Sequence, residues 1–459
     1  MPQSGTDMPP DAARPLAGMT YWQQTFGCQM NENDAERVAG MLEDAGALPV
    51  STIAEADLAV FLTCCVREKA DTRLMGQVAS VKNVPPAHPG RKRLIAVGGC
   101  IGQRDGAKLH EALQHVDVVF GTHNLGHLVG LLVQCLETGE PVVETLGEND
   151  GFSSELPLRR EKPWHAWVPI MTGCDNFCTY CIVPYVRGRE MSRTLESIEL
   201  ELAGLAAQGV QELTLLGQNV NSYGRDLYGR PRFADVLALA GESGVPRVRF
   251  VTSHPKDLLP ETIQTMARYG NIMPQLHLPL QSGSDAILRR MNRTYDSARY
   301  LSLVEQLRAA IPGISLSTDI IVGFPGETEA DFQATYDVVE QVGYGQAFTF
   351  IYSKREGTPA ASMPDDTPRE VIQERFDRLV DLVQRQALEQ NAKELGATLP
   401  VLVESASKRD ATMLAGKSPK NQTVHAPLPA GKSAADYVGS IVDVRITQAR
   451  TWYLNGELA

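Results

Sequence analysis

The stretch VPIMTGCDNFCTYC, residues 168–181, places three cysteines on a compact loop directly after an apolar run. Cys174, Cys178 and Cys181 are spaced as C-x-x-x-C-x-x-C. Three thiolates on such a loop can hold three irons of a four-iron, four-sulfur cluster, which leaves the fourth iron without a protein ligand. A zinc site and three buried thiols are the alternatives, although no fourth Cys or His stands at the spacing of a zinc finger. The spacing therefore favours an iron–sulfur cluster that binds a substrate at its open iron.

Apolar runs alternate with helical patterns on the C-terminal side of this loop. The runs, each with the composition of a buried strand, are 168–171, 213–216, 248–251, 276–280, 314–322 and 347–351. Six such units predict an open (β/α) barrel, in which the active site forms at the carboxyl ends of the strands. Residues just after each run are therefore the first candidates for chemistry.

The N-terminal side shows the same alternation. Its apolar runs and helical patterns occupy 21–26, 34–45, 58–63, 94–97, 116–120 and 125–136. They predict an α/β domain built on a parallel sheet, which the polar segment 147–162 separates from the barrel. Residues 1–18 contain several prolines and neither a basic start nor an apolar run, so we expect a disordered tail rather than a signal peptide.

A different pattern follows the barrel. A long helical pattern at 369–395 leads into a segment in which 400–404 and 441–447 alternate apolar and polar residues with period two. Together with glycines that mark turns, this alternation predicts a small antiparallel β barrel. The expected domains are a tail at 1–18, an N-terminal domain at 19–137, the (β/α) barrel at 160–390 and the small barrel at 393–458.

The composition of the 459 residues is that of a globular protein, with 43% hydrophobic and 21% charged residues. No apolar run reaches the roughly eighteen residues that a membrane helix needs. A formal net charge of −12 excludes a generally basic surface, so any RNA contact must come from a local patch. We expect a cytoplasmic protein, and in that reducing compartment the eight cysteines serve metal ligation, catalysis or packing rather than disulfides.

A second set of cysteines lies in the N-terminal region. Cys28, Cys64 and Cys100 are far apart in the sequence, but each follows a predicted strand. The carboxyl ends of parallel strands meet at one edge of a sheet, so these thiolates can converge and hold a second cluster with an open iron. The alternative is three unrelated, small buried residues. Cys135 lies on an apolar helical stretch, where we expect a packing role.

The loop at 168–181 resembles the radical S-adenosylmethionine (SAM) superfamily, because it follows the first strand of the barrel and carries Tyr180 before its last cysteine. Three short sequence motifs resemble those of the methylthiotransferase family, which combines an auxiliary-cluster domain, a radical core and a C-terminal TRAM domain. These motifs are Gly27-Cys28-Gln29-Met30-Asn31, Thr63-Cys64 and Gly98-Gly99-Cys100. The resemblance covers about residues 19–458, and the stretch 23–31, QQTFGCQMN, is most similar to the bacterial branch that modifies N(6)-dimethylallyladenosine in tRNA.

The resemblance implies an enzyme that converts N(6)-dimethylallyladenosine at position 37, next to the anticodon, into its 2-methylthio derivative. It implies SAM and two 4Fe-4S clusters as cofactors. The implied ligands are Cys28, Cys64 and Cys100 for the auxiliary cluster and Cys174, Cys178 and Cys181 for the cluster that binds SAM. The alternatives are a methylthiotransferase acting on threonylcarbamoyl-adenosine in tRNA or on a ribosomal protein, and a non-catalytic iron–sulfur protein that binds RNA. The motif Gln-Met-Asn after Cys28 argues against the two alternative methylthiotransferase substrates.

One departure from the family pattern concerns the second auxiliary ligand. The family reads Asn-Thr-Cys-Ser there, whereas this chain reads Leu62-Thr63-Cys64-Cys65. We expect Cys64 to be the ligand because it stands at the family cysteine. Cys65 would face the opposite side of an extended chain.

The resemblance also indicates residues at strand ends that contact SAM. Gln218 and Asn219 offer carbonyl acceptors where many radical SAM enzymes carry Gly-Gly-Glu, the alternative being a polar turn without a ligand. The full set expected to bind the cofactor is Gln218, Asn219, Gln281, Ser282, Asp319 and Gly323. His254 and His277 also follow strands, but packing explains them equally well and neither is assigned a role.

Basic residues in two places are expected to meet RNA phosphates. They are Arg187, Arg189 and Arg193 after the cysteine loop and Lys408, Arg409, Lys417 and Lys420 in the tail. A solvated charge run is the alternative for the first group. The expected partners are the tRNA anticodon loop, an electron donor such as flavodoxin or ferredoxin, and proteins that supply sulfur or iron–sulfur clusters. We expect a monomer without membrane contact.

Overall fold

The computed structural model describes residues 14–64, 68–88, 90–148 and 151–459. Cys65 and most of the expected tail lie outside the described residues. The chain forms two compact units. Unit 1 holds the residues up to Glu161 together with 172–175 and 182–190, and unit 2 holds 162–171, 176–181 and 191–459.

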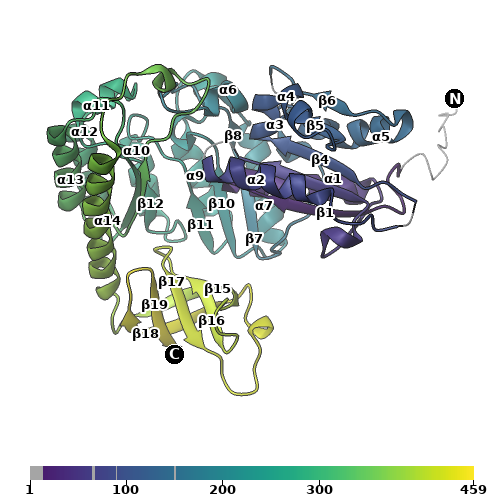
Figure 1. The fold of residues 1–459 in the computed structure, drawn as a ribbon. Helices are drawn as coiled ribbons and strands as arrows, with labels where there is room; N and C mark the ends of the chain where they lie inside the picture. The colour runs from purple at the N-terminus through teal and green to yellow at the C-terminus, as the bar shows by residue number, and fades with distance from the viewer. Residues whose placement is uncertain (1–13, 65–67, 89, 149–150) are drawn as a thin grey trace, which may run out of the picture. The chain divides into compact units, whose positions relative to one another are not determined.

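Unit 1 is built on a six-stranded sheet in the order β2-β1-β3-β4-β5-β6, in which every neighbouring pair is parallel (Figure 1). The strands are β1 (Thr20–Thr25), β2 (Leu48–Pro49), β3 (Leu58–Thr63), β4 (Leu94–Gly99), β5 (Val118–Phe120) and β6 (Val142–Glu144). The helices are α1 (Gln29–Asp44), α2 (Glu68–Val81), α3 (Cys100–Asp105), α4 (Ala107–Ala112), α5 (Leu128–Thr138) and α6 (Val183–Arg187). The predicted parallel α/β fold is confirmed.

The central strand β3 explains why this sheet is visible in the sequence as an apolar run. All of its residues are buried. Leu58, Val60 and Leu62 pack into one apolar cluster, whereas Ala59 and Phe61 pack into another on the opposite face. Because both faces are covered, successive side chains are apolar rather than alternating with polar ones.

Unit 2 contains six parallel strands and a second, smaller barrel. The six strands are β7 (His165–Pro169), β10 (Glu212–Leu216), β11 (Arg247–Phe250), β12 (Gln275–His277), β13 (Ser315–Val322) and β14 (Gln346–Ile351). They form two three-stranded sheets, β11-β10-β7 and β12-β13-β14, which a parallel bridge between Val248 and Ile272 joins into one open barrel. The predicted open (β/α) barrel is therefore confirmed.

The first strand of this barrel starts earlier than the apolar run at 168–171 suggests. β7 begins at His165, whose Nε2 lies 3.1 Å from Thr214 Oγ1 on the neighbouring strand. A polar residue that pairs inside a sheet does not register as part of an apolar run, so the predicted boundary was wrong by three residues.

The main helices of this barrel are α7 (Leu195–Ala207), α9 (Phe233–Glu242), α10 (Pro260–Arg268), α11 (Asp285–Arg290), α12 (Ser297–Ala310), α13 (Glu329–Val342) and α14 (Arg369–Ala392). The ends of α13 follow from local chemistry. Thr328 and Asp331 form a reciprocal capping box at its start. Gly343 ends it in the left-handed conformation that glycine adopts most easily, with φ of +60°.

Helix α14 leads into the small barrel, which closes in the order β15-β16-β17-β19-β18. Its strands are β15 (Thr398–Ala406), β16 (Met413–Lys417), β17 (Thr423–Pro427), β18 (Ile441–Ala449) and β19 (Tyr453–Leu458). Four of the five pairings are antiparallel, as predicted, and β17 pairs with β19 in parallel. Among the described residues, the helices are all too short or too polar to span a membrane.

Candidate functional site

Three cysteines of unit 1 lie at the carboxyl ends of adjacent strands. Cys28 precedes α1 just after β1, Cys64 follows β3, and Cys100 begins α3 directly after β4. The pairings β1–β3 and β3–β4 bring these strand ends to one edge of the sheet. Cys64 and Cys100 are buried, whereas Cys28 is exposed, so solvent has access to one side of the set.

Two glycines beside these cysteines have no room for a side chain. Gly27 has φ of +134°, and a Cβ there would lie 2.3 Å from Cys64 Cβ. Gly99 has φ of +87°, and a Cβ there would lie 2.7 Å from Thr63 O. These close approaches allow the strand ends and the cysteines they carry to pack against each other.

A buried guanidinium accompanies the three thiols. Arg187, at the end of α6, donates from Nη2 to Asn31 Oδ1 and to Asp34 Oδ2, each at 2.8 Å. Hydrogen bonding with Cys64 lowers the pKa of Cys28 to about 6, and the charge of Arg187 adds to the lowering. Burial alone would lower the pKa of Arg187, but Asp34 and the thiols of Cys100 and Cys28 raise it. The environment therefore favours the thiolate of Cys28, the form that binds metal.

The donor set fits a four-iron cluster better than it fits a single ion. In the described parts of the chain, no three His, Cys, Asp or Glu side chains converge on one metal position. A cluster takes each thiolate on a different iron and does not need such convergence. Three thiols at one strand edge, with a cation beside them, are the donors that a cluster requires.

The second half of the loop at 174–181 belongs to unit 2 and is held by main-chain hydrogen bonds. Cys181 N donates to Cys178 O at 2.9 Å, which closes a turn between these two cysteines. Thr179 N donates to Met291 O at 3.0 Å, and Ala360 N donates to Thr179 O at 2.8 Å. In unit 1, Cys174 N donates to Gly188 O at 3.1 Å. Main-chain hydrogen bonds therefore hold the loop at its first cysteine and between its last two cysteines.

A second buried guanidinium lies beside this loop. Arg293 Nη1 is 3.7 Å from Cys178 Sγ and donates to Tyr180 Oη at 3.1 Å. Tyr180 in turn packs edge-on against Phe324, with ring centroids 6.5 Å apart. Sequence reasoning did not select Arg293, because nothing in its neighbourhood in the sequence marks it as a partner of residues more than a hundred positions away.

Several polar side chains at the carboxyl ends of β10 and β11 carry atoms without a hydrogen-bond partner among the described residues. The buried atoms are Gln218 Oε1, Asn219 Oδ1, Asn221 Nδ2, Ser253 Oγ and His254 Nε2. Asn219 is oriented by its Nδ2, which donates to Asp257 Oδ2 at 2.7 Å. Buried polar atoms without partners are rare in proteins, and here they occur together at the end of the barrel where ligands bind. Gln218 and Asn219 were in the predicted cofactor set.

The other members of the predicted cofactor set are placed differently. Gln281 has φ of +66° and forms a bridge with Ile320. Ser282 Oγ lies 3.1 Å from Thr335 Oγ1 in a buried position, and Asp319 Oδ2 lies 3.3 Å from His277 Nε2. Gly323 donates its N–H to Glu327 Oε2 at 2.8 Å. Ser282 and Gly323 thus make internal contacts that shape the strand ends.

His254 is a site residue that sequence reasoning considered and left unassigned. Its Nδ1 accepts a hydrogen bond from Lys256 N at 3.2 Å, so Nε2 carries the proton in the neutral ring. Burial, together with the charges of Arg293 and Lys256, lowers the pKa of His254 well below its usual value. The residue therefore presents a neutral N–H donor at the end of β11.

The predicted RNA contacts divide into buried and exposed residues. Arg187 and Arg193 are buried, and Arg193 Nη1 binds Pro169 O at 2.8 Å and Glu201 Oε2 at 2.5 Å. Arg189 has an exposed side chain that pairs with Asp175 at 3.0 Å. The structure thus places Arg187 and Arg193 away from the surface position that a phosphate contact requires.

The four predicted residues of the small barrel also differ among themselves. Lys408 and Arg409 are exposed in the connection between β15 and β16. Lys417 and Lys420 are only partly exposed, and they bind Thr423 Oγ1 at 3.1 Å and Glu394 Oε1 at 2.6 Å. Lys408 and Arg409 are therefore open to an anion from solvent, whereas Lys417 and Lys420 already bind side chains of the protein.

Three parts of the chain match known protein families. Residues 20–121 match the Uncharacterized protein family UPF0004, residues 168–339 match the Radical SAM superfamily, and residues 392–459 match the TRAM domain. The first match covers β1 to β5 of unit 1, the second runs from the end of β7 through β13 into α13, and the third covers all five strands of the small barrel.

Curated relatives match over nearly the whole length. The chain is 47% identical over 444 residues to the tRNA-2-methylthio-N(6)-dimethylallyladenosine synthase of Streptomyces viridosporus, which covers 95% of this chain and 87% of that protein. It is 46% identical over 446 residues to the protein of the same name from Carboxydothermus hydrogenoformans, which covers 96% and 100%.

Solved structures match at the level of the fold. The radical SAM methyltransferase TsrM from Kitasatospora setae, with cobalamin and a 4Fe-4S cluster bound, has a TM-score of 0.55 at 14% identity and covers 75% of this chain and 77% of its own. The cobalamin-dependent radical enzyme OxsB, with aqua-cobalamin and SAM bound, has a TM-score of 0.51 at 13% identity and covers 81% and 56%. At such identities the likeness concerns the fold alone.

Proposed function

We infer that this chain, which belongs to the bacterial methylthiotransferase family of tRNA-2-methylthio-N(6)-dimethylallyladenosine synthases, is a radical SAM enzyme that converts N(6)-dimethylallyladenosine at position 37 of tRNA into its 2-methylthio derivative. The observation that carries this function is the second set of cysteines. Cys28, Cys64 and Cys100 gather at one strand edge beside Arg187, in addition to the cysteine loop of the barrel.

We propose that the two sets hold two 4Fe-4S clusters. Cys28, Cys64 and Cys100 would hold the auxiliary cluster, supported by their shared strand edge and their cationic neighbour. Cys174, Cys178 and Cys181 would hold the cluster that binds SAM, supported by their spacing in the chain. When bound, the clusters and SAM supply the radical and sulfur chemistry that side chains alone cannot perform.

The residues at the ends of β10 and β11 would bind and orient SAM or the target base. Gln218 Oε1 and Asn219 Oδ1 are buried acceptors, which suit an ammonium group such as that of the methionine portion. Ser253 and the neutral His254 offer donors on the neighbouring strand. A ligand that satisfies these atoms recovers the free energy that their unpaired burial costs, about 1–3 kcal/mol for each group.

We propose the domain layout expected from the sequence, with auxiliary-cluster, radical SAM and TRAM domains at 19–137, 160–390 and 393–458. Gln281, Ser282, Asp319 and Gly323 would shape the cofactor site, and Arg189, Lys408 and Arg409 would contact RNA. The proposed partners are the tRNA anticodon loop, a low-potential electron donor such as flavodoxin or ferredoxin, and a supplier of sulfur. The enzyme would act as a cytoplasmic monomer.

The function is tested by reconstituting the chain without oxygen and supplying dithionite, SAM and tRNA that carries N(6)-dimethylallyladenosine. Mass spectrometry of the digested tRNA should show the 2-methylthio nucleoside, and the supernatant should contain deoxyadenosine. A tRNA with threonylcarbamoyl-adenosine serves as the matched control and should remain unmodified. Modification of the control tRNA alone would assign the chain to the other branch, and absence of deoxyadenosine would contradict an enzymatic role.

A further inference from the structure

The small barrel is fixed to the amino-terminal end of the larger barrel by two arginines. Arg247 and Arg249 lie on β11, and both are buried. Arg247 donates to Lys417 O at 2.9 Å and to Ser418 O at 2.7 Å, and Arg249 donates to Ser418 O at 2.8 Å and to Pro419 O at 3.1 Å. Glu212 Oε2 accepts from Arg249 Nε at 2.8 Å and compensates part of the buried charge.

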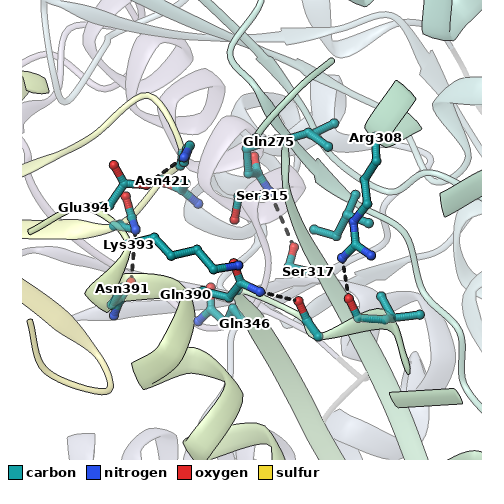
Figure 2. A pocket seen from close by; sticks show the side chains of 18 of the residues that line it. Gln275, Arg308, Ser315, Ser317, Gln346, Gln390, Asn391, Lys393, Glu394 and Asn421 are labelled. Carbon is teal, nitrogen blue, oxygen red and sulfur yellow. Dashed lines mark hydrogen bonds and ion pairs between the residues drawn. The ribbon is translucent and has the colours of Figure 1, made fainter. Parts of the chain in front are cut away.

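A cavity of about 670 Å³ lies next to this joint, and we call it the junction pocket. Its floor includes the first residues of three strands, Gln275, Ser315 and Gln346. Figure 2 shows Arg308 of α12 on one side and Lys393 and Glu394, which follow α14, on the other. The turn at 417–423 of the small barrel completes the wall. The pocket is therefore composed of both barrels and opens at the end opposite to the carboxyl ends of the strands.

The charges of the junction pocket are mostly positive. Its charged lining residues are Arg308, Lys393, Glu394, Lys417 and Lys420. Four cations face one carboxylate, and Glu394 pairs with Lys420 at 2.6 Å, so a local excess of three positive charges remains in a chain whose net charge is −12. Burial lowers the pKa of Lys417. A bound anion would raise this pKa again, because a nearby negative charge favours the protonated amine. This excess is the local basic patch that an acidic chain needs for contact with RNA.

The uncharged lining also favours a nucleic acid over an apolar ligand. Amide side chains line the pocket at Gln275, Gln341, Gln346, Gln390, Asn391, Asn421 and Gln422. Such amides and lysines bind phosphate and sugar oxygens, and Trp452, 56% exposed at the edge of the pocket, offers a stacking face.

We propose that the junction pocket binds phosphodiester groups of the substrate RNA at a point remote from the modified base. This proposal rests on the proposed function, because it assigns a second contact to the same RNA. The longest strand of the open barrel, β13, has eight residues and spans about 26 Å, so the pocket and the carboxyl ends of the strands lie about one barrel height apart. A contact at that distance strengthens RNA binding and does not participate in chemistry.

The test removes two pocket charges, one on α12 and one at the end of α14. Arg308→Gln with Lys393→Gln changes two exposed residues, so the urea midpoint of unfolding should stay close to that of the unaltered chain. The matched control is Arg299→Gln with Lys432→Gln, which removes the same charges from exposed positions on α12 and on the small barrel outside the pocket. Binding of tRNA carrying N(6)-dimethylallyladenosine is measured by anisotropy over a range of salt concentrations.

We expect the pocket variant to reduce the slope of log affinity against log salt by about 1.4 to 1.8, which is two lost contacts at 0.7 to 0.9 each. The KM for tRNA should rise while kcat stays within twofold, and the control should leave the slope unchanged. Trp452→Phe should reduce the fluorescence quenching that tRNA causes in the unaltered chain, which has four tryptophans. Equal slopes for the two double variants, or quenching as large in Trp452→Phe as in the unaltered chain, would overturn the pocket as an RNA site. Failure of the unaltered chain to methylthiolate tRNA would overturn the proposed function instead.

Discussion

The two cysteine sets each provide three thiols, but one set lies on a single loop and the other is brought together by the fold. Cys174, Cys178 and Cys181 stand on one continuous loop, and main-chain hydrogen bonds fix its second half. The auxiliary set is collected from three strand ends, so its geometry depends on the whole sheet of unit 1. Each set nevertheless has one buried arginine beside its sulfurs, Arg187 in unit 1 and Arg293 in unit 2. A local site survives small changes in the fold, whereas a site built by topology fails when the strand ends move.

The strongest test of this comparison removes each set in turn. The unaltered protein should bind about eight irons after reconstitution, and each triple Cys→Ala variant should bind about four. Loss of Cys174, Cys178 and Cys181 should abolish deoxyadenosine formation. Loss of Cys28, Cys64 and Cys100 should abolish the methylthio product and leave SAM cleavage measurable. Iron content that stays unchanged in either variant would show that the set in question holds no cluster.

The dependence of the auxiliary set on its sheet is tested by Gly27→Ala. The new methyl group would lie 2.3 Å from Cys64 Cβ at a backbone φ of +134°, so the strand ends must separate. We expect iron content to fall by about half, as in the triple variant of that set, and the methylthio product to be lost. Gly18→Ala is the control, because its φ is also positive, at +78°, but no atom lies within 4 Å. Equal iron content in the two variants would contradict tight packing at Cys64.

The next prediction concerns the stability that the ion pair of Arg187 with Asp34 provides in unit 1. Arg187→Met leaves the buried Asp34 carboxylate without its guanidinium partner, which costs about 3–5 kcal/mol in the free energy of unfolding. The control Arg189→Met removes an exposed ion pair with Asp175, which costs about 0–1 kcal/mol. Urea unfolding without oxygen measures both. If Arg187→Met weakened tRNA binding without a change in stability, Arg187 would be the phosphate contact that its sequence position suggests.

The sequence predicted the strands and the cysteines because their signals are local. Buried parallel strands such as β3 are continuous apolar runs, and the loop at 174–181 is recognisable from its spacing alone. Cys28, Cys64 and Cys100 could be grouped because each follows such a run. The same reasoning failed at β7, where the polar His165 begins the strand.

The sequence could not show how polar residues are distributed between surface and interior. Arg187 and Arg189 are two positions apart, yet one is buried against Asp34 and the other pairs at the surface with Asp175. Arg308 and Lys393 line one pocket although they come from different parts of the chain. Such pairings depend on tertiary contacts, which composition and periodicity do not encode.

Unit 2 contributes a pH dependence of the free energy of unfolding through Glu327. This carboxylate is buried, accepts the N–H of Gly323 at 2.8 Å, and lies in the loop after Phe324, which packs on Tyr180 of the cysteine loop. Burial raises the pKa of Glu327 to about 7, and the N–H of Gly323 and the charge of Arg375 reduce the effect. Because the pKa in the folded state exceeds the usual value near 4.5, the folded chain binds the proton more tightly than the unfolded chain does.

The tighter proton binding of Glu327 in the folded chain adds to the free energy of unfolding. This addition is complete below pH 4.5 and is lost as the pH rises through 7. Between pH 5 and pH 8 the loss amounts to about 2.5 kcal/mol, since one pKa unit corresponds to about 1.4 kcal/mol. Glu327→Gln keeps an acceptor for Gly323 and cannot ionise, so its free energy of unfolding should decline less over this range. The difference between variant and unaltered chain, measured by urea unfolding at pH 5 and pH 8, isolates Glu327 from other titrating groups. Parallel pH profiles would mean that Glu327 is already ionised in the fold and that Arg375 compensates its charge in full.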